Sequence, residues 1–300
     1  MINLSYNISP TLKSFISKIE LLRQKILLTP LAPKVELQLR WKATINRVYW
    51  SMISIGKPLN KERIIKLLEE PQKTGRSTQD YQPIKYKKAL DYIKEFWLVS
   101  QERIGPKTIL TLHDIACYGN FRSSLAELKQ LLDYLQSSPE QPVIQAGIAY
   151  IEILNISPFT QGSTQIACLL SLIFLYKAGY DFRGLVVLEE YFHKENASFS
   201  QNLTPFLESF ASAMMAQLEK IAYSNLSSKE FLPTSFWQLN DRQKEILNFL
   251  ENPDAAITNK KVQSLYGISQ ITASRDLTKL ANLGLLFAHG KGRSVFYTRV

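Results

Sequence analysis

With 300 residues, 45% of them hydrophobic and 21% charged, the chain has the composition of a globular protein with a large core and a second small domain. This composition excludes a membrane-spanning chain, because the longest uncharged apolar run, 166–176, is far shorter than the roughly 20 residues that cross a bilayer. The net charge of +10 favours a nucleic acid or another anionic partner, and a merely basic cytosolic protein is the alternative.

The start of the chain and its cysteines indicate a cytoplasmic protein. Residues 1–10 lack a basic stretch followed by an apolar one, so we expect no secretory signal. Cys117 and Cys168 stand in apolar, helix-like surroundings, which favours two buried, reduced thiols. No cluster of Cys and His has the spacing of metal ligands, and we expect no metal site.

Apolar residues recur at steps of three and four through the first 222 residues, which predicts an all-α body without sustained strands. A first helix would end before Pro30, a second would run over 36–54, and Gly56 would help to stop it. Residues 71–83 have the composition of a polar loop. The further expected helical segments are 60 or 61–68, 86–96, 108–115, 125–135, 143–154, 166–176, 182–192 and 199–222.

A polar turn, residues 155–165, separates two of the most apolar expected helices. Pro158 cannot continue a helix, Gly162 frees the backbone, and Ser163 or Thr164 would cap the helix that follows. Several backbone N–H groups and the positive end of a helix would then converge, as in an anion site. A plain buried helix–turn–helix is the alternative reading of the same residues.

This turn resembles the signature loop of the Fic (Fic/Doc) family, His-Pro-Phe-x-(Asp/Glu)-Gly-Asn-Gly-Arg-x-x-Arg. Pro158, Phe159 and Gly162 match it. The positions that differ are Ser157 for the histidine, Gln161 for the metal-binding carboxylate, Ser163 and Thr164 for Asn-Gly, and Gln165 and Cys168 for the two arginines. The resemblance is therefore to a degenerate copy that keeps the scaffold residues and lacks the chemical ones.

A second stretch resembles the inhibitory motif of the same family, Ser/Thr-x-x-x-Glu-(Gly/Asn), which lies on an early helix. Ser51 and Gly56 match, and Ile55 replaces the glutamate. In the family this glutamate pairs with the second signature arginine, and a buried charge left alone costs several kcal/mol. Ile55 opposite Cys168 is the pair that this reasoning predicts.

The resemblance extends over about residues 35–222, with 84–90 and 109–113 similar to further family segments. Family members then carry a flap, a β-hairpin that holds the target peptide by strand addition. Only residues 114–124 are available for it here, which is very short for a flap.

The resemblance implies transfer of AMP from ATP, with the histidine as base, the carboxylate on Mg²⁺ and the arginines on phosphate. Ser157 is no base, Gln161 is a poor Mg²⁺ ligand, and Gln165 and Cys168 carry no charge. We therefore expect no catalytic residues and no cofactor. A divergent, AMPylation-like transferase that uses ATP and Mg²⁺ at a remodelled loop is the alternative, and a remnant anion site at the backbone of 162–165 stays open.

From residue 240 the pattern changes to that of a winged helix-turn-helix. Asn240, Thr258 and Ser269 would cap helices over 241–250, 259–266 and 270–283, and Gly267 would make the central turn. Two short strands, 285–289 and 294–298, would flank a basic hairpin. The expected fold is an all-α Fic-like helical domain with a small C-terminal winged-helix (α+β) domain. The expected boundaries are 1–34 for an N-terminal helix, 35–223 for the Fic-like domain, 224–239 for a linker and 240–300 for the winged helix.

The third helix of such a domain enters the major groove of DNA with its N-terminal part. Ala273 would lie on its exposed face, whereas Ile271 and Leu277 would face inward. The candidate base-edge residues are Gln270, Thr272 and Ser274 beside Ser269, and the candidate phosphate-binding residues are Arg275, Lys279, Lys291 and Arg293. Residues 241–300 carry a net charge of +4, from nine Lys and Arg against five Asp and Glu.

The sequence thus predicts a catalytically inactive, Fic-like pseudoenzyme that binds DNA or regulates transcription through its winged helix. Its resemblance to bacterial Fic proteins with two domains implies a homodimer. A scaffold that uses both domains for protein contacts is the third reading, because winged helices also bind proteins.

Overall fold

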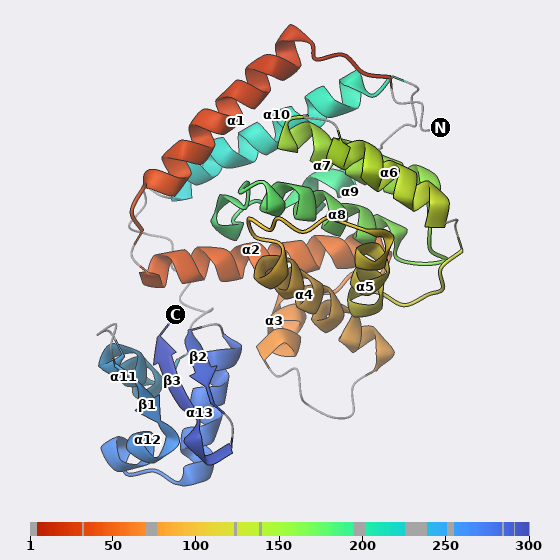
Figure 1. Ribbon diagram of the computed structural model, residues 1–300. Helices are drawn as coiled ribbons and strands as arrows, with labels where there is room; N and C mark the ends of the chain where they lie inside the picture. Colours follow the sequence, from red (N-terminus) through yellow and green to blue (C-terminus); the bar gives the residue numbers. More distant parts are fainter. Residues whose placement is uncertain are drawn as a thin grey trace.

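The computed structural model describes residues 5–31, 33–69, 77–122, 125–137, 140–194, 202–225, 239–250, 255–283, 285–290 and 292–299. They form a helical body followed by a small domain that contains helices and a three-stranded sheet (Figure 1). This arrangement confirms the predicted fold class. Within the described residues, no helix is long and apolar enough to cross a membrane.

The elements of the body follow the predicted order closely. They are α1 (Pro10–Leu28), α2 (Pro33–Ser54), α3 (Lys61–Glu69), α4 (Thr78–Phe96), α5 (Pro106–Ala116), α6 (Leu125–Ser137), α7 (Pro142–Ile156), α8 (Ser163–Lys177), η1 (Phe182–Gly184), α9 (Leu188–Lys194), α10 (Thr204–Lys220) and η2 (Ile221–Asn225).

Helices α7 and α8 lie side by side in the core of the body (Figure 1). Every residue of α8 from Gln165 to Tyr176 is buried, because α2, α4, α5 and α9 surround it together with α7. A helix that is apolar on all sides is stable only in such a central position. The core therefore fixes the turn between the two helices, where the degenerate signature lies.

Two expectations for the body are wrong. Residues 78–83 belong to α4 rather than to a loop, because Ser77 caps the helix, which accommodates Pro83 in its interior. Residues 71–76 lie outside the described part. The expected helix 182–192 is divided into η1 and α9, since Phe182 and Arg183 adopt left-handed backbone angles, with φ of 46° and 56°.

The first and last α-helices of the body, α1 and α10, pack against each other. α1 packs along α10, and its C-terminal part also contacts η2 (Figure 1). The ammonium of Lys25 lies 3.6 Å from the ring centroid of Tyr223, in the middle of η2. The expected N-terminal helix is thus packed against the body, and the expected linker begins within η2 and continues through residues 226–238, which lie outside the described part.

The C-terminal domain consists of α11 (Asp241–Phe249), β1 (Ile257–Thr258), α12 (Asn259–Tyr266), α13 (Gln270–Asn282), β2 (Leu286–His289), η3 (Gly292–Ser294) and β3 (Phe296–Arg299). Its strands are antiparallel in the order β1-β3-β2, so β3 is central and β2 is an edge. The two predicted strands are confirmed, whereas β1 was not expected because two residues give no pattern.

Local signals place the helices of this domain. Asn240, Thr258 and Ser269 cap α11, α12 and α13, each accepting a hydrogen bond from the backbone N–H three residues later. Gly267 ends α12 in the left-handed conformation, with φ of 61°. All three predicted caps and the predicted turn are confirmed.

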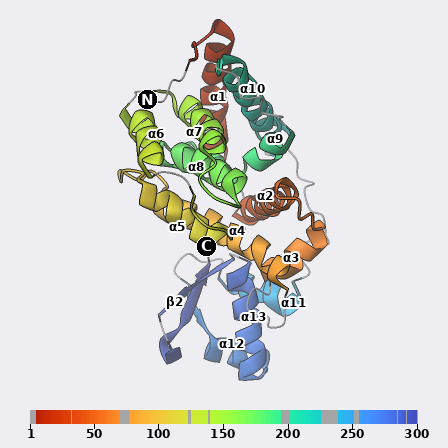
Figure 2. The ribbon, with the colours of Figure 1, turned by 90° about the vertical axis from the view of Figure 1, so that its right-hand side faces the viewer.

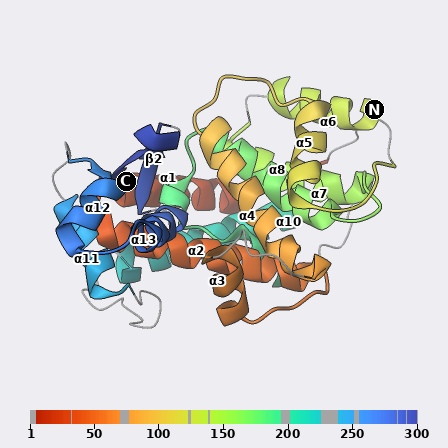
Figure 3. The same ribbon diagram turned by 90° about the horizontal axis from the view of Figure 1, so that it is seen from below.

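Helix α13 lies against α3, so the small domain contacts the body through its third helix. Figure 2 shows the turn between α12 and α13 at the end of the domain that is farthest from the body. Seen from below in Figure 3, the domain lies to one side of the body, beside α2 and α3. The N-terminal part of α13 is therefore not covered by the described part of the body.

Candidate functional site: a closed loop and an open helix face

The loop between α7 and α8 is built on two left-handed residues. Ser157 ends α7 with φ of 45°, and Gly162 precedes α8 with φ of 87°. The prediction that Ser163 or Thr164 caps α8 is wrong, because both residues are already helical and Gly162 is the N-cap. The hydroxyl of Ser163 instead bonds to the backbone N–H and C=O of Phe159, each at 3.3 Å, and so closes the loop internally.

Residues 117–122, which we call the strap, lie over this loop. They belong to the segment 114–124, which was expected to be very short for a flap. The backbone of Asn120 and the backbone and hydroxyl of Thr160 form two hydrogen bonds of 2.9 Å. Arg122 donates a backbone hydrogen bond to the carbonyl of Pro158 and side-chain bonds of 3.0 and 2.7 Å to the carbonyl and hydroxyl of Ser157. The strap thus pairs with the backbone of the loop, and an isolated β-bridge joins Phe121 to the loop as well.

Phe159 holds the loop against α5. Its ring is buried and stacks on His113 of α5, with ring centroids 3.8 Å apart and planes 6° apart. The Nε2 of His113 lies 3.1 Å from the carbonyl oxygen of Gln161, a contact in which the neutral ring donates. Burial lowers the pKa of His113, which keeps the ring neutral. His113 therefore holds the loop in place, a role that the sequence did not indicate.

The position of the first signature arginine is occupied by a buried amide. Gln165 donates a hydrogen bond of 2.8 Å to the hydroxyl of Ser51 on α2. Its carbonyl accepts from the thiol of Cys117 at 3.2 Å and from the amide of Gln82 at 3.5 Å. Neutral groups from α2, α4 and the strap thus converge on the start of α8, and none of these four brings a charge to it.

The second arginine position, Cys168, is also buried and neutral. Burial and the nearby carboxylate of Glu189 raise the pKa of its thiol well above the ordinary value. A charge pair lies close by: Arg47 donates to the carbonyl of Val186 at 3.0 Å and approaches Glu189 at 3.9 Å, and the hydroxyl of Tyr86 donates to Glu189 at 2.9 Å. The two charges are paired within the core, although one carboxylate oxygen of Glu189 has no hydrogen-bond partner among the described residues.

The inhibitory-motif remnant lies at the end of α2. Gly56 ends this helix with φ of 69°, as predicted, and Ile55 is half-buried against the core. The hydrogen bond from α8 to this remnant comes from Gln165 and reaches Ser51. The pairing of Ile55 with Cys168 stays a prediction. Within the described part of the chain, no three His, Cys, Asp or Glu side chains are grouped as metal ligands.

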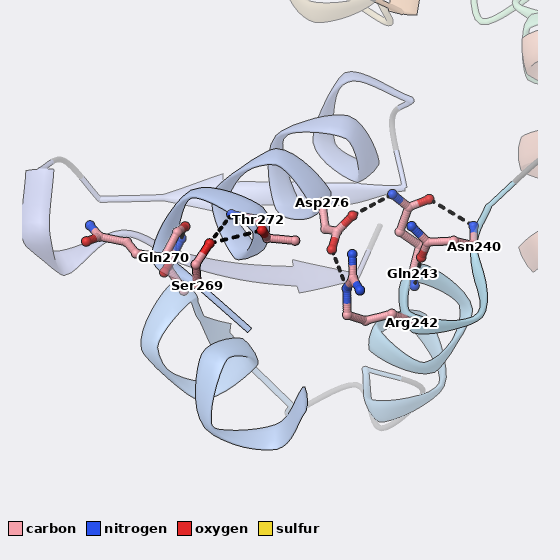
Figure 4. Close-up of polar contacts among 8 residues, drawn as sticks. Asn240, Arg242, Gln243, Ser269, Gln270, Thr272 and Asp276 are labelled. Atoms are coloured by element: carbon pink, nitrogen blue, oxygen red, sulfur yellow. Dashed lines mark hydrogen bonds and ion pairs between the residues drawn. The ribbon is translucent and has the colours of Figure 1, made fainter. Parts of the chain in front are cut away.

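The second candidate site is the outer face of α13. Ser269 and Thr272 lie at its start, where their hydroxyls are 3.0 Å apart and the Ser269 hydroxyl caps the helix (Figure 4). Gln270 points away from this cap in the same view, and its side chain is exposed. Thr272 is half-buried, so Gln270 and Ser274 are the more accessible of the candidate base-edge residues.

Two expectations for α13 are wrong. Ala273 is fully buried, and Ile271 is 66% exposed rather than turned inward. At 100° per residue, Ile271 and Leu277 are about 120° apart around a helix, and Leu277 takes the core side together with Ala273 and Asp276. The exposed stripe consists of Gln270, Ile271, Ser274, Arg275 and Thr278. Thr278 was not among the predicted site residues.

The four residues predicted to bind phosphate differ in exposure and in whether the structure describes their side chains. Arg275 is exposed on this stripe and Lys279 is half-buried beside it. Lys291 and the side chain of Arg293 lie outside the described part, so their predicted contacts with phosphate stay predictions. Gly290 and Gly292, which flank the wing tip, have φ of 83° and 62°.

A buried polar network that the sequence did not indicate holds α13 in position (Figure 4). The carboxylate of Asp276, on the inner side of α13, accepts from Arg242 at 2.6 Å and from Gln243 at 2.7 Å, both on α11. The side-chain oxygen of Gln243 also accepts a hydrogen bond of 3.2 Å from the backbone N–H of Asn240. Charge pairing and capping thus fix the angle between α11 and α13, which sets how the exposed stripe is presented.

Comparisons with known proteins agree with this division. Residues 242–298 match the DeoR-like helix-turn-helix domain. A Fic family protein from Desulfovibrio desulfuricans G20 has a similar structure, with a TM-score of 0.59 and 14% identity over 100% of this chain and 98% of that one. Fic-1 from C. elegans matches 70% of this chain and 71% of its own structure at a TM-score of 0.54 and 18% identity.

A Fic domain containing signaling protein from Bacteroides thetaiotaomicron VPI-5482 covers 72% of this chain and 96% of its own, with a TM-score of 0.52 and 19% identity. No curated protein matches the chain. The body therefore has the fold of Fic proteins, and the C-terminal domain matches a helix-turn-helix model, as the sequence predicted. At these identities, the structural similarity establishes the fold and leaves the activity to be argued from the residues.

Proposed function

We propose that this protein is a DNA-binding regulator whose helical body no longer transfers nucleotides. The observation that carries the proposal is the outer face of α13. In a domain that matches the DeoR-like helix-turn-helix, this face presents Gln270, Ser274 and Arg275 to solvent at the end that the body leaves uncovered. This is the arrangement with which helix-turn-helix proteins enter the major groove.

The division of labour on α13 follows from its residue types. The amide of Gln270 and the hydroxyl of Ser274 suit base edges, whereas the guanidinium of Arg275 suits phosphate. The net charge of +4 over 241–300 supports attraction to the duplex. Binding as a homodimer would place two such helices about one helical turn of DNA apart, and the dimer remains a prediction from the sequence.

The body supports the loss of transfer chemistry in two ways. The signature positions hold Ser157, Gln161, Gln165 and Cys168, which supply neither a base nor a cation. In addition, the strap is hydrogen-bonded to the loop backbone at Pro158 and Thr160. A peptide held by strand addition would have to displace the strap from these groups.

DNA binding is tested with the full-length chain and duplex DNA over a range of salt concentrations. We expect affinity to fall steeply with salt, with a log–log slope of about −0.9 per phosphate contact. Arg275→Ala should weaken binding to all duplexes and reduce the slope by about one. Arg103→Ala removes the same charge from the body, where the side chain is 73% exposed, and should leave binding unchanged.

If the wild-type chain shows no salt-dependent binding, the regulator proposal is wrong and a protein-contact role for the small domain takes its place. Equal losses in Arg275→Ala and Arg103→Ala would mean that charge alone, and not α13, attracts the DNA.

Loss of transfer is tested separately, with ATP, Mg²⁺ and protein acceptors. We expect no labelled AMP on any acceptor and no thermal upshift at millimolar ATP, since a ligand that binds the native state stabilises it. A clear upshift together with AMP transfer would support the divergent transferase instead. A shift without transfer would indicate a remnant nucleotide site, which leaves the DNA proposal untouched.

A further inference from the structure

Ile271 is an exposed apolar residue on the outer face of α13, which is otherwise polar. It is 66% exposed, although burying an isoleucine side chain stabilises a protein by about 1.5–3 kcal/mol. Its neighbours on the stripe, Gln270, Ser274, Arg275 and Thr278, are polar or charged. An isolated apolar side chain on a polar surface is common in proteins, so its position on the helix has to carry the argument.

The position of Ile271 on α13 is central. At 100° per residue, the buried residues Ala273, Asp276, Leu277 and Leu280 define the inner side of the helix. Ile271 lies almost directly opposite the middle of that side. It also stands one residue after Gln270, in the first turn, which is the part of a recognition helix that reaches the bases. Its side chain therefore points away from the domain along the direction in which a duplex would approach.

We propose that Ile271 determines specificity by packing against the 5-methyl group of a thymine in the major groove. Among the base edges in that groove, the thymine methyl is the apolar group that an aliphatic side chain can contact. The flanking Gln270 and Ser274 would hydrogen-bond to neighbouring edges, and Arg275 would hold the phosphate. The proposal rests on DNA binding through α13 and adds one preferred base to it.

The test starts with duplexes selected by the full-length chain from a randomised pool. Each thymine of the selected site is then replaced singly by deoxyuridine, which removes the methyl group alone. For the wild-type chain, one position in each half-site should lose about fourfold in affinity, the value expected for one buried methyl group. For Ile271→Ala, affinity for the thymine duplex should fall and the thymine and deoxyuridine duplexes should bind equally at that position.

Leu265→Ala is the matched control, because Leu265 is an exposed aliphatic residue, 44% accessible, on α12. It should keep the full difference between thymine and deoxyuridine. Both changes are at exposed helix positions where alanine favours the helix, so folding is retained. A selected site without thymine, or a methyl effect that persists in Ile271→Ala, overturns the proposal and leaves DNA binding intact. Failure of the wild-type chain to bind any duplex overturns DNA binding itself.

Discussion

Ser51 and Gln165 are 114 residues apart in the chain and share a buried hydrogen bond of 2.8 Å. The bond joins α2 to the first turn of α8, at the position of an arginine in the Fic signature. Because the surrounding Gln82 and Cys117 are also neutral and buried, this region is an uncharged polar part of the core.

Restoring the arginine should therefore destabilise the protein. In Gln165→Arg, a cation would replace a side chain that is 1% exposed, with no carboxylate among its hydrogen-bond partners. We expect a loss of about 3 kcal/mol or more in the free energy of unfolding, measured by urea denaturation. The same change at the exposed Gln161 should cost no more than about 0.5 kcal/mol. Similar losses for the two variants would show that the pocket around Gln165 accommodates charge.

The contact between Gly162 and the strap predicts a second difference between matched variants. A Cβ at Gly162 would lie 2.7 Å from the sulfur of Cys117, whereas no atom of the described residues lies within 4 Å of one at Gly179. Both glycines have positive φ, 87° and 74°, so alanine is strained by about 1 kcal/mol at either position. Urea unfolding should show that Gly162→Ala costs at least about 1 kcal/mol more than Gly179→Ala, which is the steric part. The reading is contradicted if the two variants are equally stable.

The thiol of Cys117 predicts a loss of stability at high pH. Burial raises its pKa from 9.0 in the unfolded chain to about 12 in the folded protein. Between these values the folded state holds a proton that the unfolded state has released. The thiol's contribution is thus fully present below pH 9 and is lost as the pH rises toward 12, by at most about 1.4 kcal/mol per pH unit.

Other buried groups also titrate in this range, so the comparison is between the wild-type chain and Cys117→Ser, whose hydroxyl does not ionise. The difference in unfolding free energy between the two should be constant from pH 7 to 8.5 and should shift against the wild type by pH 11. A difference that stays flat to pH 11 would place the thiol in contact with water.

The network below α13 predicts how the DNA-binding face is maintained. Asp276→Ala leaves the buried amide of Gln243 without its acceptor and Arg242 without its partner. We expect the C-terminal domain to lose about 2–3 kcal/mol of stability, monitored by amide exchange in α11 and α13. Asp241→Ala removes a carboxylate that is 94% exposed and pairs with Lys244, and it should change stability by about 0.5 kcal/mol or less. Equal effects would mean that Asp276 is not needed to join the two helices.

The sequence predicted what is decided locally. The caps at Asn240, Thr258 and Ser269 act within three residues, so their residue types were sufficient. Ser163 failed as a cap because the left-handed turn ends one residue earlier, at Gly162, a choice that depends on how the strap packs against the loop.

Features that depend on distant pairing could not be predicted. The strap bonds to a loop about 40 residues later, and no pattern in residues 117–122 announces a partner. The inward side of α13 was misassigned because Asp276, a charged residue, occupies a buried position that an apolar pattern does not include. With Asp276 on the core side of α13, Ile271 lies on the opposite side of the helix and faces outward.

The packing of α1 against α10 and η2 links the position of the first helix to the end of the body. The described part of the body ends with η2, and Lys25 lies over the ring of Tyr223 in this segment. Helix α1 and the last described segment of the body, η2, are therefore parts of one structural unit. A ligand, partner or substitution that shifts α1 should also displace η2, the last described segment before the small domain.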